Sequence, residues 1–123
     1  MISKQQALKN LFNNNHISSL EYDVMLDFLD YSIISGNEFF ISRKQVENFI
    51  QKLFDRNVSL LGIEGFIMDK DFFIPQMDLI ADFSEFNNFK LIKDAINVYF
   101  LDFNKNKHYE NTNVYFNFVI KNN

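Results

Sequence analysis

The residues of this sequence with the most capacity for chemistry are carboxylates. Six acidic residues lie between positions 64 and 85, against a single basic residue, Lys70. They are Glu64, Asp69, Asp71, Asp78, Asp82 and Glu85. Neighbouring carboxylates can share acid–base work or hold a divalent cation, and a one-sided acidic surface attracts basic partners. Two interpretations stay open for these residues: a surface that binds a basic partner, and a solvated rim around a polar hairpin.

Three more acids recur at i, i+4 and i+7 in the segment 18–36, which the pattern predicts as one helix. They are Asp23, Asp27 and Asp30. Ser18 and Glu21 make a capping-box pattern at the start of that segment, and Gly36 is a typical stop. No Lys or Arg lies in this segment. The three acids are therefore either a solvated helix face or a docking stripe for a basic partner.

Other residue types that serve in catalytic or metal sites are sparse. The two histidines, His16 and His108, lie in separate polar stretches, whereas a zinc site needs three or four ligands. The absence of cysteine excludes disulfides and thiolate ligands and fits a reducing cytosol. Three glycines cannot build the usual phosphate-binding loops. We predict no enzymatic activity, no catalytic residue, no metal ligand and no cofactor.

The composition predicts one folded domain that spans residues 1–123. Hydrophobic residues make up 47% of the chain and include 16 Phe, enough for a sizeable core. The net charge of −4 argues against nucleic-acid binding, because Lys and Arg must neutralise the phosphates. No apolar run reaches the ~20 residues that span a bilayer, and the start of the chain turns polar too early for a secretory signal. We therefore expect a cytoplasmic protein with no membrane contact.

The elements that would position the acids come in a mixed order. Helices are predicted over 3–12, 18–36, 42–57 and 84–102, with Ser42 and Ser84 as N-caps and Arg56-Asn57 as the end of the third. Strands are predicted over 58–63, 66–68, 72–74 and 114–120, with short extended pieces possible at 38–41 and 76–83. Gly62 and Gly65 indicate a bulge or a close backbone approach. This order predicts an α+β fold in which about four helices pack on a small, mostly antiparallel sheet.

Several of these stretches follow one another in an order known from a protein family. They are Ser42-Arg43-Lys44-Gln45-Val46, Val58-Ser59-Leu60-Leu61-Gly62, Phe66-Ile67-Met68, Pro75, Asp78, Asp82, the helix from Ser84 and the strand with Tyr115-Phe116. In this order they resemble the bacterial immunity proteins called immunity protein 40. Gly62-Ile63-Glu64 stands where that pattern has Gly-Gly-Asp, and the chain lacks Trp. No binding residue is carried over from the family.

The resemblance implies a protein that neutralises a toxin. Such proteins are encoded beside a polymorphic or contact-dependent toxin and bind its C-terminal toxic domain in the cytoplasm. Many of these toxins are nucleases with basic clefts, which the acidic residues described above could cover. Two other classes stay open: a small adaptor or accessory interaction protein, and an enzyme that uses the acidic hairpin with a divalent metal. The oligomeric state is not predicted.

Overall fold

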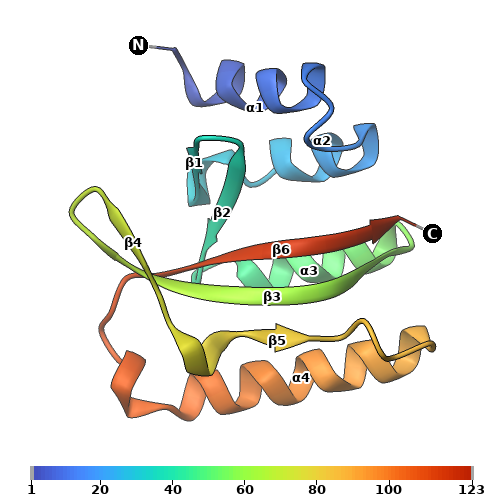
Figure 1. The fold of residues 1–123 in the computed structure, drawn as a ribbon, viewed down its shortest axis with the longest axis vertical. Helices are drawn as coiled ribbons and strands as arrows, with labels where there is room; N and C mark the ends of the chain where they lie inside the picture. Colours follow the sequence, from blue (N-terminus) through green and yellow to red (C-terminus); the bar gives the residue numbers. More distant parts are fainter. Residues whose placement is uncertain (1, 123) are drawn as a thin grey trace.

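An antiparallel pair of long strands, β3 (Val58–Asp69) and β6 (Val114–Asn122), lies at the centre of the fold (Figure 1). The structure is a computed structural model that describes residues 2–122. The pair belongs to a six-stranded antiparallel sheet of order β1-β2-β6-β3-β4, with β5 also paired to β3. The remaining strands are β1 (Ser32–Ser35), β2 (Glu38–Ser42), β4 (Phe72–Pro75) and β5 (Ala81–Asp82).

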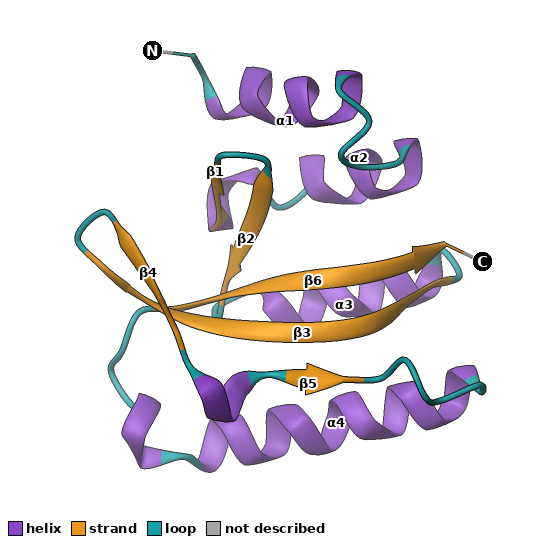
Figure 2. Ribbon diagram, in the orientation of Figure 1, coloured by secondary structure: helices purple, strands orange, loops and turns teal. Residues whose placement is uncertain are grey.

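Four α-helices accompany the sheet in the described part of the chain (Figure 2). They are α1 (Lys4–Asn13), α2 (Ser19–Leu26), α3 (Val46–Asp55) and α4 (Phe89–Lys105). Short 3₁₀ turns are η1 (Leu29–Tyr31), η2 (Met77–Leu79) and η3 (Lys107–Tyr109). The predicted single α+β domain with four helices and a mostly antiparallel sheet is confirmed.

The core lies on one face of the sheet, where β6 points aromatic side chains at two helices. The ring of Phe116 meets Phe100 and Phe103 of α4 at centroid distances of 5.5 and 5.2 Å. The ring of Phe118, two residues on, stacks on Phe49 of α3 at 5.5 Å. Phe49 and Phe116 are fully buried, and each such side chain stabilises the fold by about 1.5–3 kcal/mol. Helices α3 and α4 therefore cover the same face.

Among the described residues, an aromatic cluster covers one end of the opposite face. There Phe40, Phe66, Phe73 and Tyr115 pack together, with the rings of Phe40 and Phe73 stacked at 4.1 Å. Figure 2 shows none of the described helices in front of β3 and β6 on this side. Because side chains alternate along a strand, this face also presents Glu64, Asn117 and Val119.

The predicted helix over 18–36 is wrong in its second half. Helix α2 ends at Leu26, and Ile33 and Ile34 enter β1, where they pair with Phe40 and Phe39. Gly36, at φ +60°, makes the hairpin turn and not a helix stop. The Lys4 Nζ donates to the carbonyl oxygens of Leu29 and Ser32 at 2.9 and 2.7 Å, which satisfies the backbone where the helix is interrupted.

Two of the predicted helix starts are also wrong. Ser42 belongs to β2 and pairs with Tyr115 of β6, so α3 begins only at Val46. Ser84 lies in a turn that precedes α4, which is capped by Asn88 and continues past the predicted end to Lys105. In both cases sheet pairing or a loop holds the serine outside the helix that its local pattern predicts.

The predictions around β3 are largely confirmed. Asn57 ends α3 with φ 60°, and Lys70 turns the β3–β4 hairpin with φ 56°. The pattern does not reveal that 58–63 and 66–68 form one continuous strand. A bulge lies between Leu60 and Gly62, as the glycine indicates. The extended piece at 38–41 is β2, while 76–83 contains only η2 and the two-residue β5.

Candidate partner-binding surface

The acidic residues between 64 and 85 are all exposed, but the fold distributes them over several places. Asp69 and Asp71 flank the turn of the β3–β4 hairpin. Glu64 lies on the sheet face that the helices leave open. Asp82 of β5 pairs with Gly62, which precedes Glu64 by two residues on β3. The remaining two, Asp78 and Glu85, lie in η2 and in the loop before α4. The run is therefore not one patch.

The acidic stripe predicted for 23, 27 and 30 does not exist as a helix face. Asp27 is the C-cap of α2, and Asp30 lies in η1 beyond the helix end. Asp23 forms an ion pair with Arg56 at the end of α3, with 3.8 Å between Oδ2 and Nη2. Both side chains are about half exposed (58% and 48%), so this pair contributes at most ~1 kcal/mol.

Asp78 has a structural partner. It accepts a hydrogen bond from the hydroxyl of Tyr109, whose ring is fully buried. Burial, and then the Asp78 carboxylate beside the hydroxyl, raises the pKa of Tyr109 to about 12. The hydroxyl of Tyr99 donates to the carbonyl of Leu79 at 2.7 Å, and burial raises the pKa of Tyr99 as well. These tyrosines attach η2 to α4 and η3.

Asp82 is held in place by the residue two positions on. The backbone N–H of Ser84 donates to Asp82 Oδ1 at 2.8 Å. Hydrogen bonding from the hydroxyl and the N–H of Ser84 lowers the pKa of Asp82, because it stabilises the charged form. Asp82 is thus a fixed negative charge beside β3.

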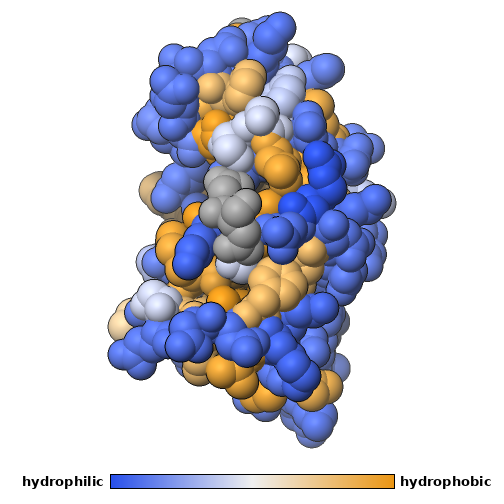
Figure 3. Space-filling model, turned by 90° about the vertical axis from the view of Figure 1, so that its right-hand side faces the viewer, coloured by the Kyte–Doolittle hydropathy of each residue, from blue (hydrophilic) through white to orange (hydrophobic). Residues whose placement is uncertain are grey.

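Two adjoining hollows lie along the middle of the sheet. One, of ≈500 Å³, lies among β3, β5 and β6, and the other, of ≈320 Å³, lies between β6 and the start of α2. Both hollows are lined by Glu38, Asn117, Phe118 and Val119, so they lie next to each other along β6. We call the two hollows together the sheet groove and define it by Glu38, Glu64, Asp82, Asn117 and Val119. Viewed from the side where β6 ends, most of the surface is hydrophilic, with hydrophobic residues showing in between (Figure 3).

The sheet groove combines apolar and acidic side chains. Val119 and Ile80 are 55% and 46% exposed in it, and three carboxylates from three different strands surround them. Among the described residues that line the two hollows there is no Lys or Arg. Sequence reasoning found Glu64 and Asp82 but missed Glu38, because the β1–β2 hairpin alone brings Glu38 to β6. The arrangement can bind a partly apolar, basic surface.

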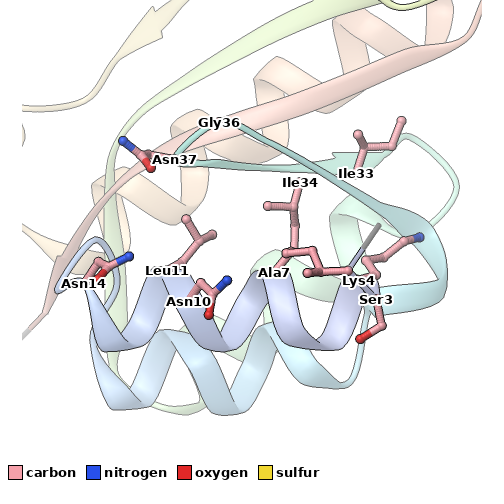
Figure 4. A pocket seen from close by; sticks show the side chains of 11 residues that line it. Ser3, Lys4, Ala7, Asn10, Leu11, Asn14, Ile33, Ile34, Gly36 and Asn37 are labelled. Atoms are coloured by element: carbon pink, nitrogen blue, oxygen red, sulfur yellow. The ribbon is translucent and has the colours of Figure 1, made fainter.

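A further hollow, of ≈580 Å³, lies between α1 and the β1–β2 hairpin (Figure 4). Its lining includes Ala7, Leu11 and Ile34, and no carboxylate. Lys4, its cation, is already engaged by two backbone carbonyls. This hollow is a gap between α1 and the hairpin, and it contains no carboxylate and no unengaged cation that would suggest a binding or catalytic site.

Nowhere in residues 2–122 do three or more His, Asp or Glu side chains converge as cation ligands. None of the described helices has the length and apolarity needed to cross a bilayer.

Comparison of the chain with protein-family models, curated proteins and solved structures finds no match. The resemblance to immunity protein 40 therefore stays a prediction, and the sheet groove is the main structural basis for a functional hypothesis.

Proposed function

We propose that this protein is an immunity protein, which binds a cognate toxin domain in the cytoplasm and blocks its active site or substrate surface. The observation that carries the proposal is the sheet groove. Glu38, Glu64 and Asp82 surround exposed apolar residues on the face that the described helices leave open. The resemblance in the order of the sequence elements gives independent support.

The physical chemistry of inhibition fits such a surface. Stable interfaces place apolar side chains at the centre and polar groups at the rim, and charge complementarity accelerates association. A nuclease cleft that binds phosphates is basic, so carboxylates held on a rigid sheet compete with the substrate for the same cations. No catalytic step is required of the inhibitor.

The experiment that tests this function is co-expression with the C-terminal domain encoded by the adjacent toxin gene. We expect restored growth and a complex that survives purification. Replacing Glu64 and Asp82 by Arg should weaken binding at low salt by about tenfold or more, because two attractive contacts become repulsive. The double change of Asp69 and Asp71 to Arg, at the hairpin turn, is the matched control and separates the groove from the hairpin. Equal affinity of the wild type and the groove variant would exclude the sheet groove.

The two alternative functions differ in what they require. An adaptor would use the same surface to bind another partner. The absence of a toxin gene beside the gene for this protein would favour the adaptor function. A metal-dependent enzyme would need converging ligands, and the described residues offer no group of three. A thermal shift with Mg²⁺ or Mn²⁺ would nevertheless support that alternative.

A further inference from the structure

One edge of the central strand β6 is open along about two thirds of its length. On the β3 side, β6 is paired from Val114 to Asn122. On the β2 side, the register contains only Ile41 with Phe116 and Ser42 with Tyr115. Figure 1 shows the β1–β2 hairpin turning away from β6, and the pairing of β2 with β6 ends at Phe116. Among the described residues, the part of β6 over 117–122 therefore has a strand partner on one side only.

Hydrogen bonds at the start of β6 show which backbone groups face the open side. The carbonyl of Val114 accepts from the N–H of Arg43 at 3.0 Å, so it points towards β2. The carbonyl of Asn113 accepts from the N–H of Met68 at 2.9 Å, so it points towards β3. These directions alternate along an antiparallel strand, and the bulge between Leu60 and Gly62 lies in β3, not in β6. Phe118 and Ile120 consequently direct their N–H and C=O groups to the open side.

The ≈320 Å³ part of the groove lies directly beside this edge. Its wall on the core side includes Ile17, Met25 and Phe39, which are apolar. The opposite side opens onto the acidic part of the sheet groove, with Glu38 at the junction. The open edge of β6 therefore has unpaired backbone groups, a hollow beside them, and an apolar wall on one side of that hollow and an acidic one on the other.

We propose that this edge of β6 accepts an extended segment of the toxin domain as an additional β-strand, and this rests on the proposed function. Strand addition supplies main-chain hydrogen bonds, and alternate side chains supply specificity. Side chains on one face of the added strand meet Ile17 and Met25, and those on the other face lie towards Glu38, with Glu64 one strand further on across β6. The occupant is thus an extended stretch that alternates apolar residues with Lys or Arg.

A second copy of this chain is a poorer occupant of the same edge. Joining two β6 strands would bring the carboxylates of two sheet grooves together, and the chain already carries a net charge of −4. Like charges opposed across an interface disfavour association. A basic segment would instead be attracted to the carboxylates, and no Lys or Arg among the described residues lines either hollow to repel it.

Residue-resolved amide hydrogen exchange tests the proposal with an internal control. In the free protein the amides of Phe118 and Ile120 should exchange quickly, while those of Asn117 and Val119, which face β3, stay protected. Adding a synthetic peptide of alternating Val and Lys, about eight residues long, should slow exchange at Phe118 and Ile120 specifically. A peptide of alternating Val and Glu is the control for charge.

Charge variants test the chemistry of the occupant. The double change of Glu38 and Glu64 to Lys should weaken binding of the Val-Lys peptide by about tenfold, which corresponds to two exposed charge contacts. Asp71→Lys, at the hairpin turn, should leave peptide affinity unchanged. No peptide binding, or binding without protection at Phe118 and Ile120, overturns the proposal.

Further outcomes separate this inference from the proposed function. If the toxin domain binds and neutralisation occurs without protection at these two amides, the function stands and strand addition is wrong. If the peptide protects them but no toxin domain binds, the edge site stands and the immunity function fails. Protection that rises with protein concentration alone would identify a second copy as the occupant and overturn the proposal.

Discussion

The hydroxyl of Tyr109 donates a hydrogen bond to the carboxylate of Asp78, which joins η3 to η2 beside α4. Tyr109 is fully buried, and its ring lies 5.6 Å from that of Phe103. Asp78 was one of the acids predicted to meet a partner. Its bond to a buried hydroxyl means that changing it perturbs the fold as well as the surface charge.

Removing either partner of this bond should destabilise the protein, but to different extents. Asp78→Ala leaves the buried hydroxyl with only a long contact of 3.4 Å to Gln76 Oε1, and should cost about 1–3 kcal/mol of unfolding free energy. Tyr109→Phe leaves Asp78 exposed to water and should cost about 1 kcal/mol. Urea unfolding measures both, and Glu85→Ala, in an exposed loop, is the control with a change within about 0.5 kcal/mol. Equal stability of Asp78→Ala and wild type would show that the bond contributes nothing.

Stability should fall in alkaline solution because of Tyr109. Its pKa in the folded protein, about 12, lies above the ordinary value of 10.0, so the folded state resists losing the proton. The stability linked to this group is complete below about pH 10 and is lost as the pH rises towards about 12. Urea midpoints measured across this window should decline, and less steeply in Tyr109→Phe. Identical declines in the two proteins would assign the effect to other groups.

Arg43 should be the most costly surface-accessible cation to remove. Its guanidinium donates to the carbonyls of Tyr109 and Thr112 and lies 4.7 Å from the ring centroid of Phe103. Arg43→Ala should lower the unfolding free energy by about 2–4 kcal/mol, because charged hydrogen bonds and a cation–π contact are lost together. Arg43→Lys should recover only part of the lost unfolding free energy, since an ammonium cannot reproduce the planar set of donors of a guanidinium. The neighbouring exposed Lys44→Ala is the matched control, and a loss there as large as in Arg43→Ala would contradict the assignment.

Gly65 should tolerate no side chain. A Cβ at this position would lie 2.6 Å from Leu79 Cδ1 and 2.7 Å from Leu79 Cβ, and Leu79 is buried. Gly65→Ala should therefore destabilise by about 1–3 kcal/mol, the cost of overpacking. Gly62→Ala is a milder comparison, because its nearest atom, the Ala81 carbonyl oxygen, lies at 3.1 Å. Thermal unfolding of both variants measures the loss of stability, and a larger loss for Gly62→Ala than for Gly65→Ala would contradict this prediction.

Local patterns were sufficient wherever the deciding contacts are close in sequence. The apolar faces of α3 and α4, the turn at Lys70 and the end of α3 at Asn57 all follow from neighbouring residues. The α+β class followed as well, because the order of helical and alternating periods limits how the elements can pack. The exposure of the acids was also predictable, since unpaired carboxylates stay in water.

Strand pairing decided the rest. Ser42 has a capping pattern, yet pairing with the distant Tyr115 keeps it extended. Ile33 and Ile34 leave a predicted helix to pair with Phe40 and Phe39 in a local hairpin, which the helical spacing of the segment conceals. The meeting of Glu38 with Glu64 and Asp82 depends on strands β2, β3, β5 and β6 arriving at one place. No window of neighbouring residues contains that information, because these strands are far apart in the chain and are held together by cross-strand pairs.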